Sequence, residues 1–280
     1  MLPKRAMRHK VPSYAGFGRD GVRRARWRTT GVYVAASTNC FPELSLSAAL
    51  GRLADLEFTN VEIVAHESGG HLKPSEIAAD LEHALRVCRQ THRLGVVAYS
   101  VEVEAPEEEY YRQFAACCKL AKATKVVTLT VRSAELGTPF NAEVERLRRL
   151  VAIASAESVV VGLLTEAGRM TQDPDTAVVL CDNVKGLAIT LDPSHYIWGP
   201  HQGGSFEQVM RYACHIRLRD TSKEAFQVRV GQGLVEYGRL VTQLNKHSYS
   251  RALCVDMAPL PGVDQSAEMR KMRLLLESLL

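Results

Sequence analysis

The stretch Gly186-Leu187-Ala188-Ile189-Thr190-Leu191-Asp192-Pro193-Ser194-His195 decides the fold class. Its apolar and β-branched residues predict a short strand buried on both faces, as parallel strands usually are. Pro193 cannot donate a hydrogen bond to a neighbouring strand, so the strand must end before it. Asp192 is then left at the carboxyl end of the strand, with His195 in the loop that follows. In α/β folds this is the edge that carries the chemistry.

The same kind of segment recurs along the chain, each time followed by residues with helical periodicity. The predicted strands cover residues 31–36, 60–65, 96–101, 125–131, 159–165, 186–191, 214–218 and 252–255. Eight strands alternating with eight helices over about 250 residues predict a single closed (β/α)8 TIM barrel. An open doubly wound sheet is the minor alternative. The carboxyl ends of barrel strands meet on one face. Five charged residues are therefore expected to gather there: Glu166, Asp192, Arg217, Asp220 and Asp256.

The helices between these strands are predicted less sharply than the strands themselves. Residues 73–94 predict one long helix with Pro74 in its first turn, where proline is well tolerated. Residues 206–213 and 237–246 predict two shorter helices near the end of the chain. Pro259 and Pro261 separate the last strand from a final helix over about 266–280.

The composition is that of a globular enzyme-sized chain, with 280 residues of which 46% are hydrophobic and 24% charged. No apolar run approaches the ~18 residues of a membrane span, and the N-terminal stretch lacks the apolar core of a signal peptide. No two cysteines form a C-x-x-C pair, which favours free thiols in a reducing compartment. We therefore expect a cytoplasmic protein without membrane contact. The cysteines stand at positions 40, 88, 117, 118, 181, 214 and 254.

The net charge of +4 conceals two regions of opposite sign. Residues 1–29 carry nine basic side chains against the single acid Asp20, which leaves 26 basic and 30 acidic residues in the remainder. We expect a basic, disordered tail over 1–29 and the barrel over 30–280. Such a tail is a solvated arm or spacer, or it touches a polyanion or partner. The mildly acidic barrel favours a small-molecule ligand over nucleic acid.

Six short segments, in order and at the predicted strand ends, resemble the xylose-isomerase-like barrel superfamily of sugar isomerases, epimerases and inosose dehydratases. They are Phe58-Thr59-Asn60-Val61-Glu62-Ile63, Leu163-Leu164-Thr165-Glu166, Leu191-Asp192-Pro193-Ser194-His195, His215-Ile216-Arg217-Leu218-Arg219-Asp220, Val230-Gly231-Gln232-Gly233 with Tyr237, and Ala252-Leu253-Cys254-Val255-Asp256. The resemblance implies a sugar or sugar phosphate isomerase or epimerase, acting on a small sugar or polyol, and a possible homodimer.

The resemblance also implies a divalent metal, Mg²⁺ or Mn²⁺, held by Glu166, Asp192 and Asp256. In that family the two outer acids, here Glu166 and Asp256, move a proton at the carbon next to the sugar carbonyl. His195, Arg217 and His66 are the residues expected to contact substrate oxygens. Asp256 stands where the family usually has glutamate, so its reach is one methylene shorter.

The histidine that the family uses as a metal ligand in strand seven falls on Arg217 here. Arginine has no lone pair to offer a cation. His215 aligns with the family's other histidine in this strand, and we expect its side chain to point away from the site. Three outcomes stay open: the carboxylates hold a metal without histidine, Arg217 replaces the metal as a fixed cation, or the barrel has lost catalysis and serves as a carbohydrate-binding or scaffold protein.

An abasic-site endonuclease is a further alternative, because that enzyme class shares the fold. It requires a three-zinc cluster rich in histidine, and strands three and four supply no histidine at their ends. The basic tail is its only support.

Each candidate residue also has a structural interpretation. Glu166 could pair with Arg217, Asp192 could cap the turn after it, and Asp256 could be a turn residue beside prolines. His195 could be a hydrogen-bonded loop residue.

The remaining motifs are weaker. His66 and His71 suggest zinc but fit polar loop groups equally well, and Gly231-Gln232-Gly233 fits a tight turn better than a dinucleotide motif. Phe41, Tyr99 and Trp198 could wall a sugar ring or pack in the core.

Overall fold

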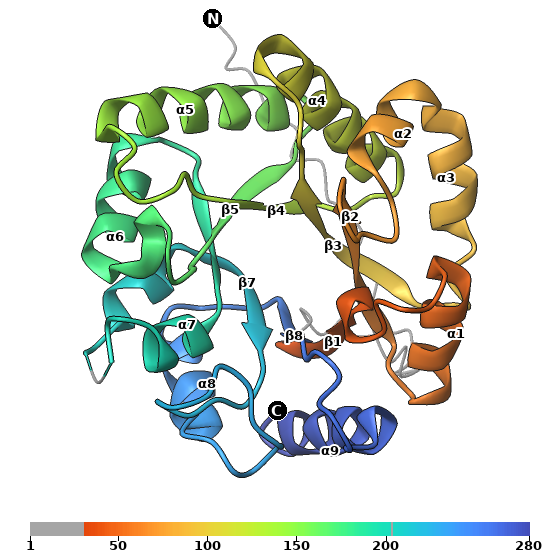
Figure 1. Cartoon of the computed structure of the whole chain (residues 1–280), viewed down its shortest axis with the longest axis vertical. Coiled ribbons are helices and arrows are strands. Elements are labelled where there is room, and N and C mark those ends of the chain that lie inside the picture. Colours follow the sequence, from red (N-terminus) through yellow and green to blue (C-terminus); the bar gives the residue numbers. More distant parts are fainter. Residues whose placement is uncertain (1–30, 203) are drawn as a thin grey trace, which may run out of the picture.

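A computed structural model describes residues 31–202 and 204–280, so the predicted tail over 1–29 lies outside the described residues. The described residues form a closed barrel of parallel strands in chain order, which confirms the predicted TIM barrel (Figure 1). The strands are β1 (Tyr33–Ser37), β2 (Asn60–His66), β3 (Gly95–Glu102), β4 (Thr128–Arg132), β5 (Val160–Leu164), β6 (Ala188–Leu191), β7 (Ala213–Leu218) and β8 (Ala252–Val255).

Helices follow the strands and form a ring around the outside of the barrel (Figure 1). The α-helices are α1 (Leu46–Asp55), α2 (Pro74–Ala79), α3 (Leu81–Arg89), α4 (Glu107–Ala123), α5 (Phe140–Ala156), α6 (Pro174–Asn183), α7 (Pro193–Trp198), α8 (Tyr237–Lys246) and α9 (Gln265–Glu277). Short 3-10 helices are η1 (Thr38–Cys40), η2 (Met170–Gln172) and η3 (Glu207–Tyr212).

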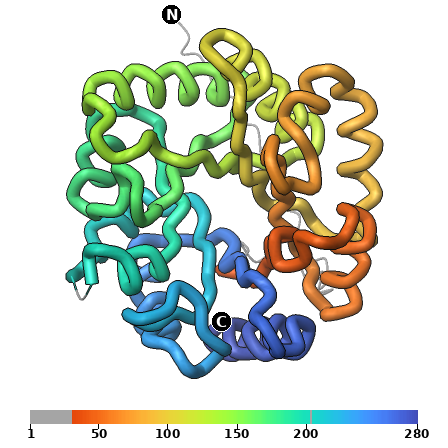
Figure 2. The backbone as a smooth tube through the Cα atoms, viewed as in Figure 1, coloured from red at the N-terminus to blue at the C-terminus, as the bar shows by residue number. Residues whose placement is uncertain are grey.

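The barrel closes where its first strand pairs with its last. Tyr33 lies opposite Ala252 and Ala36 opposite Val255, in parallel register. In Figure 2 the red start of the described chain accordingly runs beside the blue segment near its end. Closure leaves no strand edge open, which removes the usual route to edge-to-edge aggregation.

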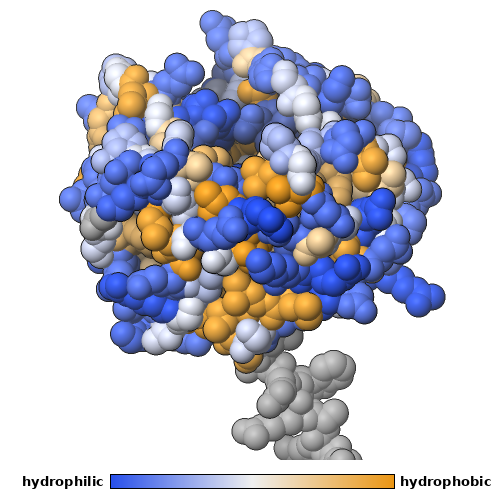
Figure 3. Space-filling model, turned by 60° about the horizontal axis from the view of Figure 1, so that its bottom comes forward, coloured by the Kyte–Doolittle hydropathy of each residue, from blue (hydrophilic) through white to orange (hydrophobic). Residues whose placement is uncertain are grey.

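The hydrophobic core lies between the strands and the helix ring. Leu50 and Leu53 of α1, Phe114 of α4 and Leu147 of α5 are fully buried against the outer face of the barrel. All seven cysteines are buried and free, as the sequence predicts. None of the described helices combines the length and the apolar composition needed to cross a membrane. On the face shown in Figure 3, apolar residues gather in patches between hydrophilic ones.

Three helix predictions need correction. The predicted helix over 73–94 breaks at Asp80, whose carboxylate accepts a hydrogen bond from the His83 amide at 2.8 Å and so begins α3 as a new helix. His195 does not lie in a loop: Pro193 opens α7, and His195 is its third residue. The segment predicted as a helix over 206–213 is the 3-10 helix η3.

We predict opposite stability changes for two glycine-to-alanine substitutions. A Cβ at Gly162 in β5 would lie 2.5 Å from Thr190 Oγ1 and 2.8 Å from Cys214 Sγ, so Gly162→Ala should cost about 1–3 kcal/mol. A Cβ at Gly238 in α8 meets nothing within 4 Å, so Gly238→Ala should stabilise by about 0.5–1 kcal/mol. Urea unfolding of both variants measures the difference, and equal effects would contradict the packing described here.

Candidate functional site

The expected convergence of charged groups at the carboxyl end of the barrel is real, but it is centred on Arg219. Its Nη2 atom lies 3.0 Å from Asp192 Oδ2 and 2.9 Å from Asp256 Oδ2. All three side chains are buried, and the Arg219 side chain is only 10% exposed. One guanidinium therefore bridges two of the three carboxylates predicted to hold a metal.

Sequence reasoning missed Arg219 and assigned the cationic role to Arg217. The missed signal is the strand period: side chains two residues apart point to the same side of a strand. His215, Arg217 and Arg219 are therefore all directed into the barrel. The prediction that His215 points away from the site is wrong for the same reason.

Arg217 and His215 share one buried partner, Glu62 of β2. Arg217 Nη2 lies 2.7 Å from Glu62 Oε1, and His215 Nε2 lies 2.6 Å from Glu62 Oε2. Arg217 Nε also donates a hydrogen bond to Glu62 Oε2 at 3.4 Å. Burial alone would raise the pKa of Glu62, but Arg217 and His215 together hold that pKa down to about 2. Arg217 also approaches Asp256, with Nη1 3.9 Å from Oδ2.

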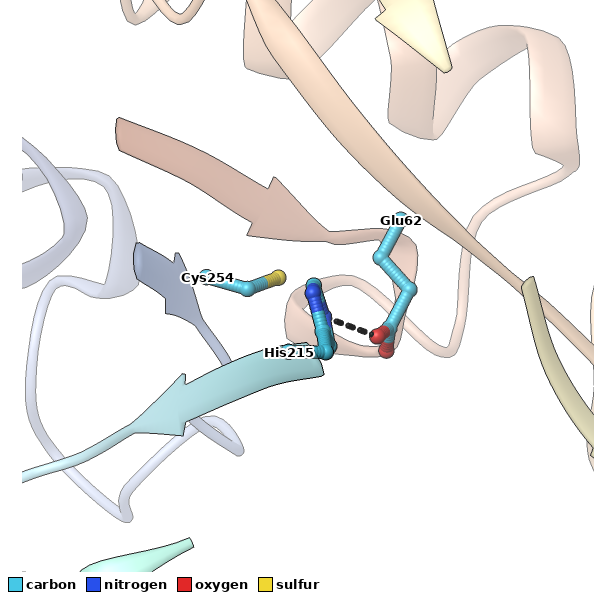
Figure 4. A group of neighbouring side chains, drawn as sticks. All are labelled: Glu62, His215 and Cys254. Atoms are coloured by element: carbon cyan, nitrogen blue, oxygen red, sulfur yellow. Dashed lines mark ion pairs between the residues drawn. The ribbon is translucent and has the colours of Figure 1, made fainter. Parts of the chain in front are cut away.

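Glu62, His215 and Cys254 bring their ligand-type atoms within 4.8 Å of one another in the barrel interior (Figure 4). These residue types can bind zinc. However, both oxygens of Glu62 already face cationic groups, and burial raises the pKa of the Cys254 thiol well above its usual value. The arrangement therefore fits an internal ion-pair group better than a metal centre.

Glu166 lies apart from the Arg219 bridge. Arg132 at the end of β4 donates hydrogen bonds to both carboxylate oxygens of Glu166, and Arg169 Nε lies 3.3 Å from Glu166 Oε2. The expectation that Glu166 pairs with Arg217 is wrong, because Arg217 faces Glu62 in the barrel interior. Arg132 is the nearer cation, and its position at the end of the adjacent strand could have identified it.

An open cleft gives solvent access to Glu166. It has a volume of about 320 Å³, and Arg132, Glu166, Ala167 and Arg169 are among its lining residues. A neighbouring cleft of about 420 Å³ shares Arg132 and Arg169 and continues toward the end of β3. A separate cleft of about 290 Å³ on the flank, between α7, η3 and α8, is lined mostly by apolar side chains and by none of the charged groups described above.

Asp192 both caps a helix and binds Arg219. Its Oδ1 accepts a hydrogen bond from the Ser194 amide at 3.0 Å, which confirms the predicted capping role. Burial would raise the pKa of Asp192, but Arg219 and His195 outweigh it, and the net direction is downward. His195 Nδ1 accepts from the Ala167 amide at 3.2 Å, so we assign its proton to Nε2, which lies 3.9 Å from Asp192 Oδ2. Burial lowers the pKa of His195 and favours the neutral ring.

The other predicted polar residues have structural partners. Asp256 Oδ1 accepts from Asn39 Nδ2 at 3.1 Å. His66 Nε2 lies 2.7 Å from Ser100 Oγ at the rim, and His71 Nε2 donates to the Phe41 carbonyl at 3.2 Å. Within the described ranges, neither histidine belongs to a group with metal-ligand geometry.

The glycine motif is the predicted tight turn, and it supports the loop after β7. The Gly231 and Gly233 amides donate to Asp220 Oδ2 at 2.7 and 3.1 Å. Gly231 has a φ of +86°, a conformation that favours glycine.

Aromatic rings cover one side of the Arg219 bridge. The Phe226 ring lies 4.5 Å from Arg219 Cζ, 4.6 Å from the His195 ring and 5.2 Å from the Trp198 ring. Trp198 is 39% exposed, whereas Tyr99 and Phe41 are buried in the core. Of the three aromatic residues proposed to wall a sugar ring, Trp198 is therefore the one with an exposed side chain.

The closed ring of eight parallel strands, with acids and bases gathered at their carboxyl ends, defines the class of the protein as a TIM barrel. Residues 50–273 match the family described as the xylose isomerase-like TIM barrel. The chain belongs to that family.

Eight solved structures of similar fold share 12–16% sequence identity with the chain. The chain is similar to 3-keto-D-glucoside 4-epimerase from E. coli, with a TM-score of 0.67, 14% identity, and coverage of 89% of this chain and 99% of that one. It is also similar to a xylose isomerase-like TIM barrel protein from Mycobacterium smegmatis in complex with magnesium, with a TM-score of 0.69, 15% identity, and coverage of 89% and 98%. No curated protein sequence matches the chain.

We predict that Glu62→Gln destabilises the barrel by about 3–5 kcal/mol, because it leaves the buried Arg217 charge without its main partner. The Glu62 pKa is lowered on folding, from an ordinary 4.5 to about 2. Its stabilising effect is therefore complete above pH 4.5 and is lost as the pH falls toward 2.

Urea unfolding of the wild type and the variant between pH 7 and pH 3 measures this effect. The difference in unfolding free energy should be largest at neutral pH and should shrink in acid. Glu145→Gln is the control, because Glu145 pairs with Arg148 on the surface and should change stability by less than about 1 kcal/mol. A pH-independent difference for Glu62→Gln would contradict the assignment.

Proposed function

We propose that this barrel binds a sugar or polyol in the open cleft at its carboxyl-end mouth, without a divalent metal. The observation that carries the proposal is the Arg132–Glu166–Arg169 array in a cleft of about 320 Å³. This volume lies at the lower end of the ~300–1,000 Å³ usual for ligand sites and suits a small ligand.

The chemistry of the array suits neighbouring hydroxyl groups. A carboxylate accepts hydrogen bonds and a guanidinium donates them, so Arg132, Glu166 and Arg169 present alternating partners for hydroxyls that can do both. Charged partners strengthen such hydrogen bonds. Glu166 stays 13% exposed despite its two arginines, so it can exchange part of this pairing for a ligand.

The aromatic side of the mouth supports the same ligand class. The Ala167 amide, in the lining of the cleft, donates to His195 of α7, and this helix ends at the exposed Trp198. An aromatic face packs against the apolar C–H face of a sugar ring, while hydroxyls at the ring edge reach polar groups. The mouth therefore offers both kinds of contact that a carbohydrate needs.

Proton transfer next to a carbonyl by Glu166 and Asp256 is the second candidate. It is favoured by Glu166, an acid that faces the open cleft. A general base must lie within hydrogen-bond reach of the proton that it takes. Here both carboxylates already contact guanidinium groups: Glu166 contacts Arg132 and Arg169, and Asp256 contacts Arg219. Because both carboxylates are already paired with arginine, ligand binding without proton transfer is the leading proposal.

An endonuclease role gains no support from the geometry. In the part of the chain that the structure describes, one group has metal-ligand geometry, and it is buried and contains a single histidine. A three-zinc site would need several exposed histidines.

We predict that isothermal titration calorimetry with ketoses, polyols and sugar acids finds a ligand whose affinity is unchanged by EDTA. Glu166→Gln and Trp198→Ala should each weaken that ligand by about tenfold or more, equivalent to about 1.4 kcal/mol. Glu104→Gln is the control: Glu104 lines only the neighbouring cleft and should leave the affinity unchanged. Binding that requires added metal, or that ignores both substitutions, would refute the proposal.

Solvent exchange separates binding from proton transfer. Incubation of the bound sugar with protein in D₂O should leave its carbon-bound protons unchanged by NMR if the barrel only binds. Deuterium next to the carbonyl, lost in Glu166→Gln, would establish the second candidate instead.

A further inference from the structure

We propose that Arg219 is a built-in replacement for a divalent cation, so that Asp192 and Asp256 form a metal site only when this arginine is removed. This inference goes beyond the proposed function, and it holds whether or not a sugar binds in the cleft.

The first step of the argument is the orientation of the two carboxylates. Asp192 uses Oδ1 to accept from the Ser194 amide, and Asp256 uses Oδ1 to accept from Asn39. Each is left with Oδ2, and both Oδ2 atoms contact the same nitrogen, Arg219 Nη2, at 3.0 and 2.9 Å. Two preoriented oxygens thus converge on one point that a positive group occupies.

The second step is steric exclusion. Mg²⁺ binds carboxylate oxygens at about 2.0–2.1 Å and Ca²⁺ at about 2.3–2.6 Å. An ion bound to both Oδ2 atoms would need the space that Nη2 fills. The cation that the family resemblance implies therefore does not fit these residues as they stand.

The third step is charge. Glu62, Asp192 and Asp256 supply three negative charges to the barrel interior, and Arg217 and Arg219 supply two permanent positive charges close to them. His215 adds a third cationic partner when protonated. The carboxylates are therefore largely neutralised without a metal, and adding a dication beside both arginines would be opposed by like-charge repulsion.

The fourth step is what keeps Arg219 in place. Phe226 stacks on its guanidinium at 4.5 Å, a favourable cation–π geometry. The loop that carries Phe226 is fixed at two points. Gln227 exchanges two hydrogen bonds with Ala258, at 2.6 and 2.8 Å, and Asp220 binds the amides of the glycine turn. Arg219 is thus built into the mouth and is not a mobile surface side chain.

The test uses Mn²⁺ alone as the probe. Its binding is measured by calorimetry and by the electron paramagnetic resonance signal of the free ion. Wild-type protein should bind it weakly or not at all. Arg219→Ala should bind one Mn²⁺ at least about tenfold more tightly than the wild type, and the double variant Arg219→Ala/Asp192→Asn should lose that gain. Mn²⁺ should also raise the melting temperature of Arg219→Ala alone, because a ligand that binds only the folded state stabilises it.

The matched control is Arg239→Ala. Arg239 also bridges two carboxylates, Glu207 at 2.8 Å and Glu236 at 3.3 Å, but on the exposed surface. Its removal should create no Mn²⁺ site, because those acids are exposed to solvent.

Two results would overturn the proposal: Mn²⁺ binding that is no tighter in Arg219→Ala than in the wild type, or a gain that persists in Arg219→Ala/Asp192→Asn. If Arg219→Ala does not fold, Arg219→Gln carries the same test, since its amide still donates to one carboxylate but has no charge. Sugar titration is a separate measurement, so failure of sugar binding leaves this result intact.

Discussion

The architecture of the site depends on the two-residue period of strand β7. That period sends His215, Arg217 and Arg219 into the barrel on one side, where acids from three other strands meet them. Glu62 comes from β2, Asp192 follows β6 and Asp256 follows β8. A buried charge is costly unless it is paired, so each basic residue on β7 requires an acid opposite, and each acid requires a base. The charged side chains of the barrel interior therefore depend on one another for pairing. They are Glu62, Asp192, His215, Arg217, Arg219 and Asp256.

The charged groups at the carboxyl end of the barrel form two sets, one buried and one open to solvent. Asp192, Arg219 and Asp256 are almost fully buried beneath Phe226, whereas Glu166 with its two arginines borders the solvent-filled cleft. A ligand can reach the second group directly. The first group serves to hold the strand ends and the loops above them in fixed positions. The family resemblance treats these acids as one set, but the structure divides them.

Much of the fold could be predicted from the sequence, because parallel strands leave a strong local pattern. β8 was predicted with its observed bounds, and the Asp192-Pro193 step correctly ended β6. The helix break at Asp80 was missed because an uninterrupted apolar period outweighed a single capping residue. The gathering of acids at the mouth also followed from the fold alone.

The pairing within that gathering could not be predicted in the same way. Which arginine meets which acid depends on strand stagger and on how far each side chain reaches. Arg217 lies one pleat deeper than Arg219, so it meets Glu62 and leaves Asp192 to Arg219. Glu166 is bound by Arg132 of the adjacent strand β4, a contact between residues 34 positions apart. The strand period is enough to identify Arg219 as a residue that faces the barrel interior, but only the three-dimensional structure identifies its two partners.

The pairing of β1 with β8 has a consequence for synthesis on the ribosome. The first strand of the barrel finds its second neighbour only in Ala252–Val255, the last of the barrel strands. Until those residues leave the exit tunnel, one edge of β1 stays without its partner, and the acids and bases of the interior lack Asp256. A nascent chain that still lacks β8 is therefore an open sheet, and its unpaired β1 edge is the surface that a chaperone has to protect.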